Sequence, residues 1–173
     1  MKLDNRNGNT KWADATKLEL ELMDSYNVFE DKGLNPTLPD GYKTIRVHFI
    51  YDVKYDGRHR ARLVADGHLT DLPTDSVYSG VVSLRGLRMF LFISELNGLI
   101  VWATDVGSAY LEAFTNEMVC IIAGPEFGAL QGHLLLISRA LYGLRSSGAR
   151  WHDRLSDVLR NKGFTPCIAE PDI

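Results

Sequence analysis

One aspartate, Asp105, stands directly after a run of apolar residues, LIVWAT (99–104), and is followed by Val-Gly-Ser. A carboxylate is costly to bury unless it is paired or binds a metal, whereas at the end of a strand it meets solvent and the strand fixes its direction. Mg²⁺ prefers one or two carboxylates together with waters and substrate phosphates. The pattern fits a metal ligand, and it also fits Asp105 or Ser108 as the N-cap of a short helix, SAYLEA (108–113).

Two further features suit a negatively charged ligand. Gly107 and Ser108 allow a close turn, so that backbone N–H groups at the start of the next helix could meet a phosphate. Residues 41–62 hold six Lys and Arg against two Asp, a net of +4 on a chain of net charge −3. A local basic patch favours an anionic partner, and a solvated strand face explains the same charges.

Composition limits the class of protein. A chain of 173 residues, 45% hydrophobic and 24% charged, has the size and balance of one globular domain. The net charge of −3 argues against a freestanding nucleic-acid binder. The two cysteines form no Cys/His cluster of metal-binding spacing. We expect no membrane anchor, because no apolar run reaches the roughly 20 residues that span a bilayer, and the polar N-terminus is not a signal peptide.

The elements that must position these residues begin with a helix and a hairpin. Thr10 is a predicted N-cap for a helix over residues 11–29, whose inner face is formed by Trp12, Ala15, Leu18 and Leu22. Residues 43–65 alternate in polarity on both sides of an Asp-Gly turn at residues 56–57, which predicts a β-hairpin.

The second half alternates helices and strands. We predict a buried apolar helix ending at Gly98, a strand over residues 99–106, and two strands over residues 117–123 and 133–138. A last helix follows Ser146 or Ser147 and ends at Gly163, and its predicted inner face comprises Trp151, Leu155, Val158 and Leu159. This order predicts an α+β fold with a largely antiparallel sheet and helices packed on one face.

Three motifs carry a family resemblance. LVADGHLT (63–70), TDVGSAYLEA (104–113) and ALYGLRSSGARW (140–151), in this order and spacing, resemble the Ty1/copia class of retrotransposon reverse transcriptases. The resemblance runs from about residue 11 to the end and implies a right-hand polymerase. It implies one partial reverse transcriptase domain with a polar tail over residues 1–10, fingers over 11–98, and part of the palm over 99–173.

The resemblance also implies site residues. Asp105 falls on the first catalytic carboxylate, which binds Mg²⁺ together with the carbonyl of Val106, and Tyr110 falls on the aromatic that packs under the sugar and rejects a 2′-OH. Arg60 and Arg62 fall where family members place cations over the incoming triphosphate. The remaining implied nucleotide-binding residues are Gly107, Ser108, Ala109, Tyr142 and Gly143, and the implied nucleic-acid-binding residues are Arg58, Arg145 and Arg150. Where the family more often has Lys-Gln-Ala-Pro-Arg before its Trp, this chain has Arg145-Ser-Ser-Gly-Ala-Arg150.

The expected function is that of an RNA-directed DNA polymerase, which adds dNTPs to a primer by two-metal phosphoryl transfer. Two ions about 3.5–4 Å apart need carboxylates from two places, and the family supplies the second set from a Tyr-x-Asp-Asp hairpin. No Asp-Asp pair occurs in this sequence, so we expect truncation before that motif and no activity of the isolated chain.

The resemblance implies several partners and a location. The implied partners are Mg²⁺, dNTP, an RNA or DNA template-primer, and the rest of the pol polyprotein, with its thumb, RNase H and integrase. The implied location is the cytoplasm, in virus-like particles. Two alternatives stay open, which are a non-catalytic nucleic-acid-binding remnant and a co-opted interaction module.

Overall fold

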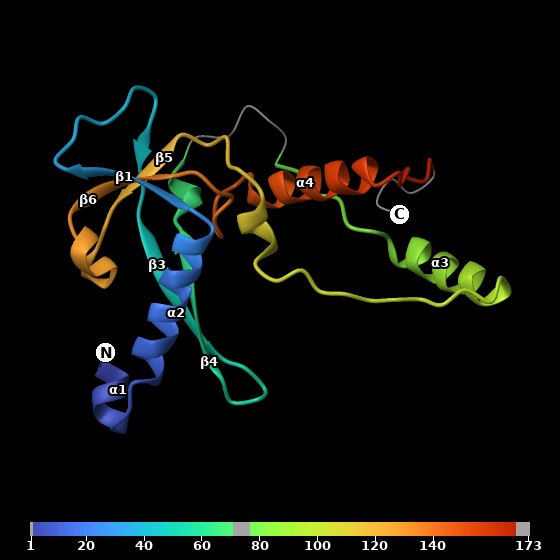
Figure 1. The fold of residues 1–173 in the computed structure, drawn as a ribbon, viewed down its shortest axis with the longest axis horizontal. Coiled ribbons are helices and arrows are strands. Elements are labelled where there is room, and N and C mark those ends of the chain that lie inside the picture. The colour runs from blue at the N-terminus through green and yellow to red at the C-terminus, as the bar shows by residue number, and fades with distance from the viewer. Residues whose placement is uncertain (1, 71–76, 169–173) are drawn as a thin grey trace.

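The computed structural model describes residues 2–70 and 77–168. Its main sheet has the strand order β1-β6-β5-β2, and a separate hairpin is formed by β3 and β4 (Figure 1). β1 pairs with β6 and β6 with β5 in antiparallel fashion, and β2 joins β5 in parallel. The sheet strands are β1 (Phe29–Leu34), β2 (Lys43–Thr44), β5 (Val119–Ile122) and β6 (His133–Ile137). The predicted α+β class with mostly antiparallel pairing is confirmed.

The predicted hairpin is also confirmed, with a later start. β3 (Val47–Val53) and β4 (His59–Ala65) pair in unbroken register from Val47 opposite Ala65 to Val53 opposite His59. Gly57 takes φ +81° in the connecting turn, a conformation that glycine adopts without steric cost. The hairpin begins at residue 47 rather than 43 because Lys43 and Thr44 pair with β5 instead.

Helix α2 (Lys11–Ser25) covers β4. Its buried stripe runs through Ala15, Glu19 and Met23 at intervals of four residues, and Thr16 lies beside it. Leu18, which we assigned to the inner face, is 65% exposed. The helix ends earlier than predicted because Asn27 adopts a left-handed φ of +50°. That turn sends the chain into β1, a strand that the sequence analysis did not predict.

The N-terminal residues form a helix rather than the expected tail. α1 (Lys2–Asn7) carries Asp4, which is only 3% exposed. The Asp4 carboxylate accepts the backbone N–H groups of Trp12 at 3.0 Å and Ala13 at 2.9 Å. Asp4 therefore satisfies the free amides at the start of α2. Thr10 occupies the N-cap position without capping it and donates its hydroxyl to Asp14 instead.

The core lies where α2, the base of the hairpin and the main sheet meet. Its fully buried members come from every part of this region, and the largest are Met23, Val28, Leu63, Leu111, Ile121, Leu135 and Leu141. The 3-10 helix η2 (Ala109–Glu112) contributes Leu111, and the residues after β6 contribute Leu141. The motifs that surround Tyr110 and Tyr142 are thereby anchored in the same core.

The apolar helix forms, but its predicted burial is wrong. α3 (Leu84–Leu96) runs unbroken through Gly86, and Gly98 follows at φ +63°, as predicted. Figure 1 shows α3 standing apart from the sheet and from α2. Twelve large apolar side chains of α3 and of the residues that follow it are exposed, from Leu84 at 61% to Trp102 at 88%. A helix buries an apolar face only against another element, and within the described ranges none covers this one.

The predicted strand over residues 99–106 is likewise wrong, because these residues form no ladder and no regular structure. The sheet therefore lacks the strand that we expected to end at Asp105. The helical cover is also less complete than predicted, since α2 packs on the hairpin while α3 makes no extensive contact with any strand in the described part of the chain. No helix in the described part of the chain is long and apolar enough to cross a membrane.

The last helix, α4 (Ser147–Asn161), packs against η2 and ends before Gly163, as predicted. Its predicted inner face is largely exposed, however. Leu155 and Leu159 line an open groove with residues 80–82 rather than the core, and Val158 is 36% exposed. The remaining short helices are η1 (Gly67–Leu69) and η3 (Pro125–Leu130), which lie in loops. Parts of the predicted loop over residues 67–80 and of the C-terminal segment fall outside the described residues.

Candidate nucleotide-binding site

Three residues from distant motifs meet at one place. β4 supplies Arg62, the turn after β6 supplies Tyr142, and η2 supplies Tyr110. The guanidinium carbon of Arg62 lies 5.8 Å from the centre of the Tyr142 ring, within cation–π range. The centres of the Tyr142 and Tyr110 rings are 5.4 Å apart, with the planes inclined by 38°. The structure thus joins one predicted phosphate-binding arginine to two predicted nucleotide-binding tyrosines.

The alternation of β4 places its arginines on the face opposite the core. Ala61 and Leu63 are buried, while Arg60 and Arg62 are partly exposed. The Nε of Arg62 is buried and has no hydrogen-bond partner among the described residues. An unpaired buried donor is costly, and more so when it is charged. Because Arg62 as a whole is partly exposed, its positive charge is suited to an acceptor that comes from outside, such as a phosphate oxygen.

Glycine at two positions lets the Tyr142 turn approach β4 closely. The N–H of Ala65 donates to the carbonyl of Tyr142 at 2.7 Å. Gly143 adopts φ +90°, and a Cβ there would lie 2.1 Å from the Ala65 oxygen. A Cβ on Gly67 would lie 2.2 Å from the Gly143 oxygen. Any larger residue would push the turn away from β4, so the two glycines set the position of Tyr142.

Arg145 also links the Tyr142 turn to the residues that follow β4. Its Nε donates to the carbonyl of Gly67 and its Nη2 to the carbonyl of His68, both at 3.0 Å. We expected Arg145 to bind nucleic acid, but two of its donors hold the backbone that follows the hairpin. The arginine of the LYGLR motif therefore serves to fasten the Tyr142 turn to the residues after β4.

Glu19 was missed by the sequence analysis. It is 8% exposed, and its Oε1 accepts the backbone N–H of Leu63 at 3.0 Å. Burial raises the pKa of the Glu19 carboxyl, and the Leu63 hydrogen bond and the charges of Arg60 and Arg62 oppose that rise. The signal that could have revealed it is its spacing of four from both Ala15 and Met23, which puts a carboxylate in an apolar stripe.

The pKa of the Tyr142 phenol is influenced by the same charged groups. Burial is the main cause that raises the pKa of its phenol, and Arg62 opposes it. Glu19 acts on Tyr142 in the raising direction and Arg60 in the lowering direction. The carboxylate, the two arginines and the tyrosine therefore form one electrostatic cluster.

Asp105 lies outside this contact network. It is exposed in residues 99–106 and, within the described ranges, has no hydrogen-bond or ion-pair partner. Val106 is exposed beside it, and Gly107 has open space around its Cβ position. Ser108 takes a left-handed φ of +53°, and its carbonyl accepts Leu111 N–H at 2.9 Å, so η2 begins at the next residue. Neither Asp105 nor the Ser108 side chain caps that helix.

The described residues do not form a complete metal site. They contain no group of three or more His, Cys, Asp or Glu side chains that could hold an ion. Asp105 offers one carboxylate, and two-metal chemistry needs several. A Mg²⁺ pair therefore does not fit the donor set in the described part of the chain.

The other two predicted nucleic-acid contacts are paired with neighbouring acids. At the hairpin turn, Arg58 Nη2 lies 2.6 Å from Asp56 Oδ2. On α4, Arg150 Nη2 lies 2.8 Å from Asp153 Oδ2. Exposed pairs of this kind contribute little to stability. The positive charges of Arg58 and Arg150 are therefore each offset by a neighbouring carboxylate.

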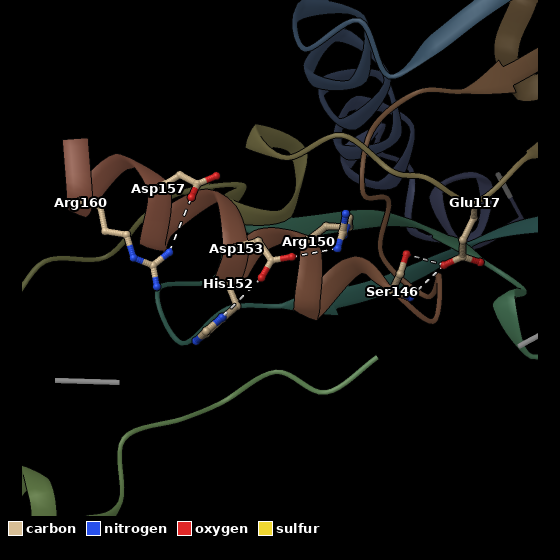
Figure 2. A network of polar contacts seen from close by, with 7 residues as sticks. All are labelled: Glu117, Ser146, Arg150, His152, Asp153, Asp157 and Arg160. Carbon is tan, nitrogen blue, oxygen red and sulfur yellow. Dashed lines mark hydrogen bonds and ion pairs between the residues drawn. The ribbon is translucent and has the colours of Figure 1, made fainter. Parts of the chain in front are cut away.

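Figure 2 shows how α4 is fixed at its start and charged along its length. Glu117 Oε1 accepts the Ser146 N–H at 2.8 Å and the Ser146 hydroxyl at 2.7 Å. Farther along the helix, Arg160 approaches Asp157 at 3.7 Å. The sequence analysis placed the start of this helix at Ser146 or Ser147; Ser146 holds the N-cap position without a side-chain cap bond, and its N–H and hydroxyl donate to Glu117 instead.

Comparison with known proteins now adds the family. The model of the family described as "Reverse transcriptase (RNA-dependent DNA polymerase)" matches residues 35–173. The Transposon Ty1-DR4 and Ty1-DR6 Gag-Pol polyproteins of Saccharomyces cerevisiae are each 29% identical over 144 residues, 82% of this chain. The chain spans 9% and 8% of their respective lengths. No solved structure matches. The chain thus belongs to the reverse transcriptase family and is related to the polymerase of Ty1 retrotransposons.

Proposed function

We propose that the chain forms the fingers, residues 11–98, and part of the palm, residues 99–173, of an RNA-directed DNA polymerase. We further propose that its cluster of Arg60, Arg62, Tyr110 and Tyr142 binds the incoming dNTP. The observation that carries this proposal is the meeting of Arg62, Tyr142 and Tyr110 from three separate motifs.

Each residue has a chemical role in this proposal. The partly exposed Arg62 side chain binds phosphate oxygens, and Arg60 adds a second positive charge. The flat ring of Tyr110 packs under the sugar and leaves no room for a 2′-OH. The backbone of residues 107–109 faces the phosphates, and Gly143 keeps Tyr142 in place.

Asp105 and the carbonyl of Val106 are proposed as Mg²⁺ ligands by family membership. Because the described residues supply a single carboxylate there, we propose that the chain binds nucleotide without catalysing its incorporation. The template-primer and the remainder of a Gag-Pol polyprotein are the proposed partners, and a virus-like particle in the cytoplasm is the proposed location. Arg58, Arg145 and Arg150 remain proposed nucleic-acid contacts, and Arg145 acts mainly through the backbone that it holds.

Equilibrium titration of the chain with dTTP in the absence of metal tests the nucleotide site. Arg62→Gln should weaken binding by about tenfold or more, since a hydrogen bond to a charged group contributes roughly 1.5–3 kcal/mol. Lys17→Gln is the matched control, because Lys17 is an exposed cation paired with Glu21 on α2. Equal affinity of the wild type and Arg62→Gln would refute the nucleotide site.

The sugar contact has a separate test. Tyr110→Val should reduce the preference for dTTP over the corresponding ribonucleotide, because valine lacks the ring that blocks the 2′-OH. The measurement is the ratio of the two dissociation constants. An unchanged ratio would show that Tyr110 does not lie under the sugar and would leave the Arg62 result unaffected.

An interaction module is the second candidate, and one observation favours it. The exposed apolar side chains of α3 and residues 99–106 form a continuous stretch, and such patches mark protein contacts or aggregation sites. This candidate predicts a stable oligomer in sedimentation experiments and no measurable affinity for dTTP. A monodisperse monomer that binds dTTP would exclude it.

A further inference from the structure

Glu19 places a negative charge beside the two arginines that the proposed function assigns to the triphosphate. Glu19 belongs to α2, and its buried carboxylate accepts the N–H of Leu63, the residue directly after Arg62. That amide lies on the edge of β4 that faces away from β3, and such unpaired strand edges need cover. The Glu19 carboxylate pairs with this amide and places a negative charge at the edge of the strand.

The Glu19 carboxylate acts on Arg60 and Arg62 through its charge and not through a direct contact. Among the described residues, neither Arg60 nor Arg62 forms a direct ion pair with Glu19, although both interact with it electrostatically. The guanidinium of Arg62 lies over the Tyr142 ring instead. Because no ion pair with a described residue occupies either arginine, both remain able to meet another anion, while the Glu19 carboxylate offsets part of their positive charge.

We propose that Glu19 is a positioning residue that fixes β4 at Leu63 and acts as an internal counter-anion for Arg60 and Arg62. Its carboxylate lowers the affinity of the arginine pair for polyphosphate, so that the pair can hold a triphosphate and still release it. This inference rests on the proposed triphosphate role of Arg62.

Glu19→Gln separates the charge from the hydrogen bond. The glutamine carbonyl keeps an acceptor for the Leu63 N–H, and the negative charge is lost. Titration with tripolyphosphate at about pH 8, well above the ordinary range of a carboxyl pKa, should show binding about three to ten times tighter than in the wild type. The gain should shrink as salt is added, because it is electrostatic. Glu21→Gln is the matched control, since it removes the same charge from an exposed position on α2, and it should bind as the wild type does.

Two further variants test the backbone contact. Glu19→Ala loses both the charge and the acceptor, and it should bind tripolyphosphate less tightly than Glu19→Gln because β4 is no longer fixed at Leu63. Glu19→Asp keeps the charge on a shorter side chain, and its binding should be no tighter than that of the wild type. A purely structural role for Glu19 would instead give Glu19→Gln wild-type affinity and wild-type salt dependence.

The outcomes separate this inference from the proposed function. If Arg62→Gln weakens tripolyphosphate binding and Glu19→Gln does not tighten it, the counter-anion role is refuted and the nucleotide site stands. If Arg62→Gln has no effect, the nucleotide site is refuted, and the counter-anion role falls with it. Tighter binding by Glu19→Asp would also overturn the inference, even if Glu19→Gln could not be obtained folded.

Discussion

The strand that carries Arg62 and the segment that carries Asp105 are held in opposite ways. β4 is covered by α2, its edge amide is satisfied by Glu19, and the turn of Tyr142 closes against its end. The segment over residues 99–106 has no strand partner, and α3 before it is exposed along its length. Two regions with equally recognisable motifs thus differ completely in how firmly they are positioned.

A sequence motif identifies a residue, whereas packing against neighbouring elements fixes its position. Binding sites work when rigid elements and neighbouring hydrogen bonds fix each side chain. The arginine and tyrosine side of the candidate site meets that condition within this chain. The aspartate side does not meet it.

Core truncation should give the largest difference between the two regions. Leu63→Ala removes a fully buried side chain beside Arg62 and should lower the free energy of unfolding by about 2–5 kcal/mol. Phe92→Ala on the exposed α3 should change it by about 0.5 kcal/mol or less. Denaturant titration of both variants measures the contrast, and equal losses would show that α3 is packed in solution.

Gly143→Ala should give the next largest effect. Its Cβ would lie 2.1 Å from the Ala65 oxygen, and its φ is +90°, so the change combines overpacking with a left-handed backbone at a cost of about 2–4 kcal/mol. Gly107→Ala, with open space around the new methyl group, should leave stability nearly unchanged. Thermal melts of the pair check this, and a stable Gly143→Ala protein would contradict the close junction of the Tyr142 turn and β4.

Removing the Glu117 contact should have a moderate effect. Glu117→Ala leaves the Ser146 amide and hydroxyl without their acceptor and should lower the free energy of unfolding by about 1–2 kcal/mol. Asp157→Ala on the same helix loses only an exposed ion pair, so about 0–0.5 kcal/mol is expected. Urea unfolding followed by circular dichroism compares them, and a larger loss in Asp157→Ala would refute the assigned roles.

The smallest predicted effect is a pH dependence. The pKa of Glu19 is raised in the folded chain above its ordinary value of 4.5, mainly by burial. A raised pKa means that the stability contribution of Glu19 is complete below the unfolded pKa and is lost as pH rises through the folded pKa. Glu19→Gln should therefore be more stable than the wild type at neutral pH and lose this advantage toward pH 4. Stability curves at several pH values decide it, and a constant difference would contradict the burial account.

Local patterns in the sequence were sufficient for several elements. The Asp-Gly turn at residues 56–57 located the hairpin, glycines marked the ends of α3 and α4, and apolar runs located β5 and β6. The motifs also brought Arg62, Tyr110 and Tyr142 onto one list of site residues, which the structure then placed together.

The remaining features depend on contacts that no local pattern contains. Asp4 and Glu19 look like ordinary charged residues of solvated helices until α2 and β4 are docked. β1 was missed because its sequence, FEDKGL, is mostly polar and its pairing comes from β6, about a hundred residues later. The predicted strand over residues 99–106 failed for the converse reason, because apolar residues form a strand only when a neighbouring strand pairs with them.

Primer extension is the decisive experiment, because it shows whether the chain holds the nucleotide side of the site without a complete metal centre. The chain is incubated with a template-primer, dNTPs and Mg²⁺, and dTTP binding is measured in the same preparation. We predict binding that depends on Arg62 and no detectable extension. Magnesium-dependent extension that is lost in Asp105→Asn would contradict the account, because Asp105 would then have its metal partners within this chain.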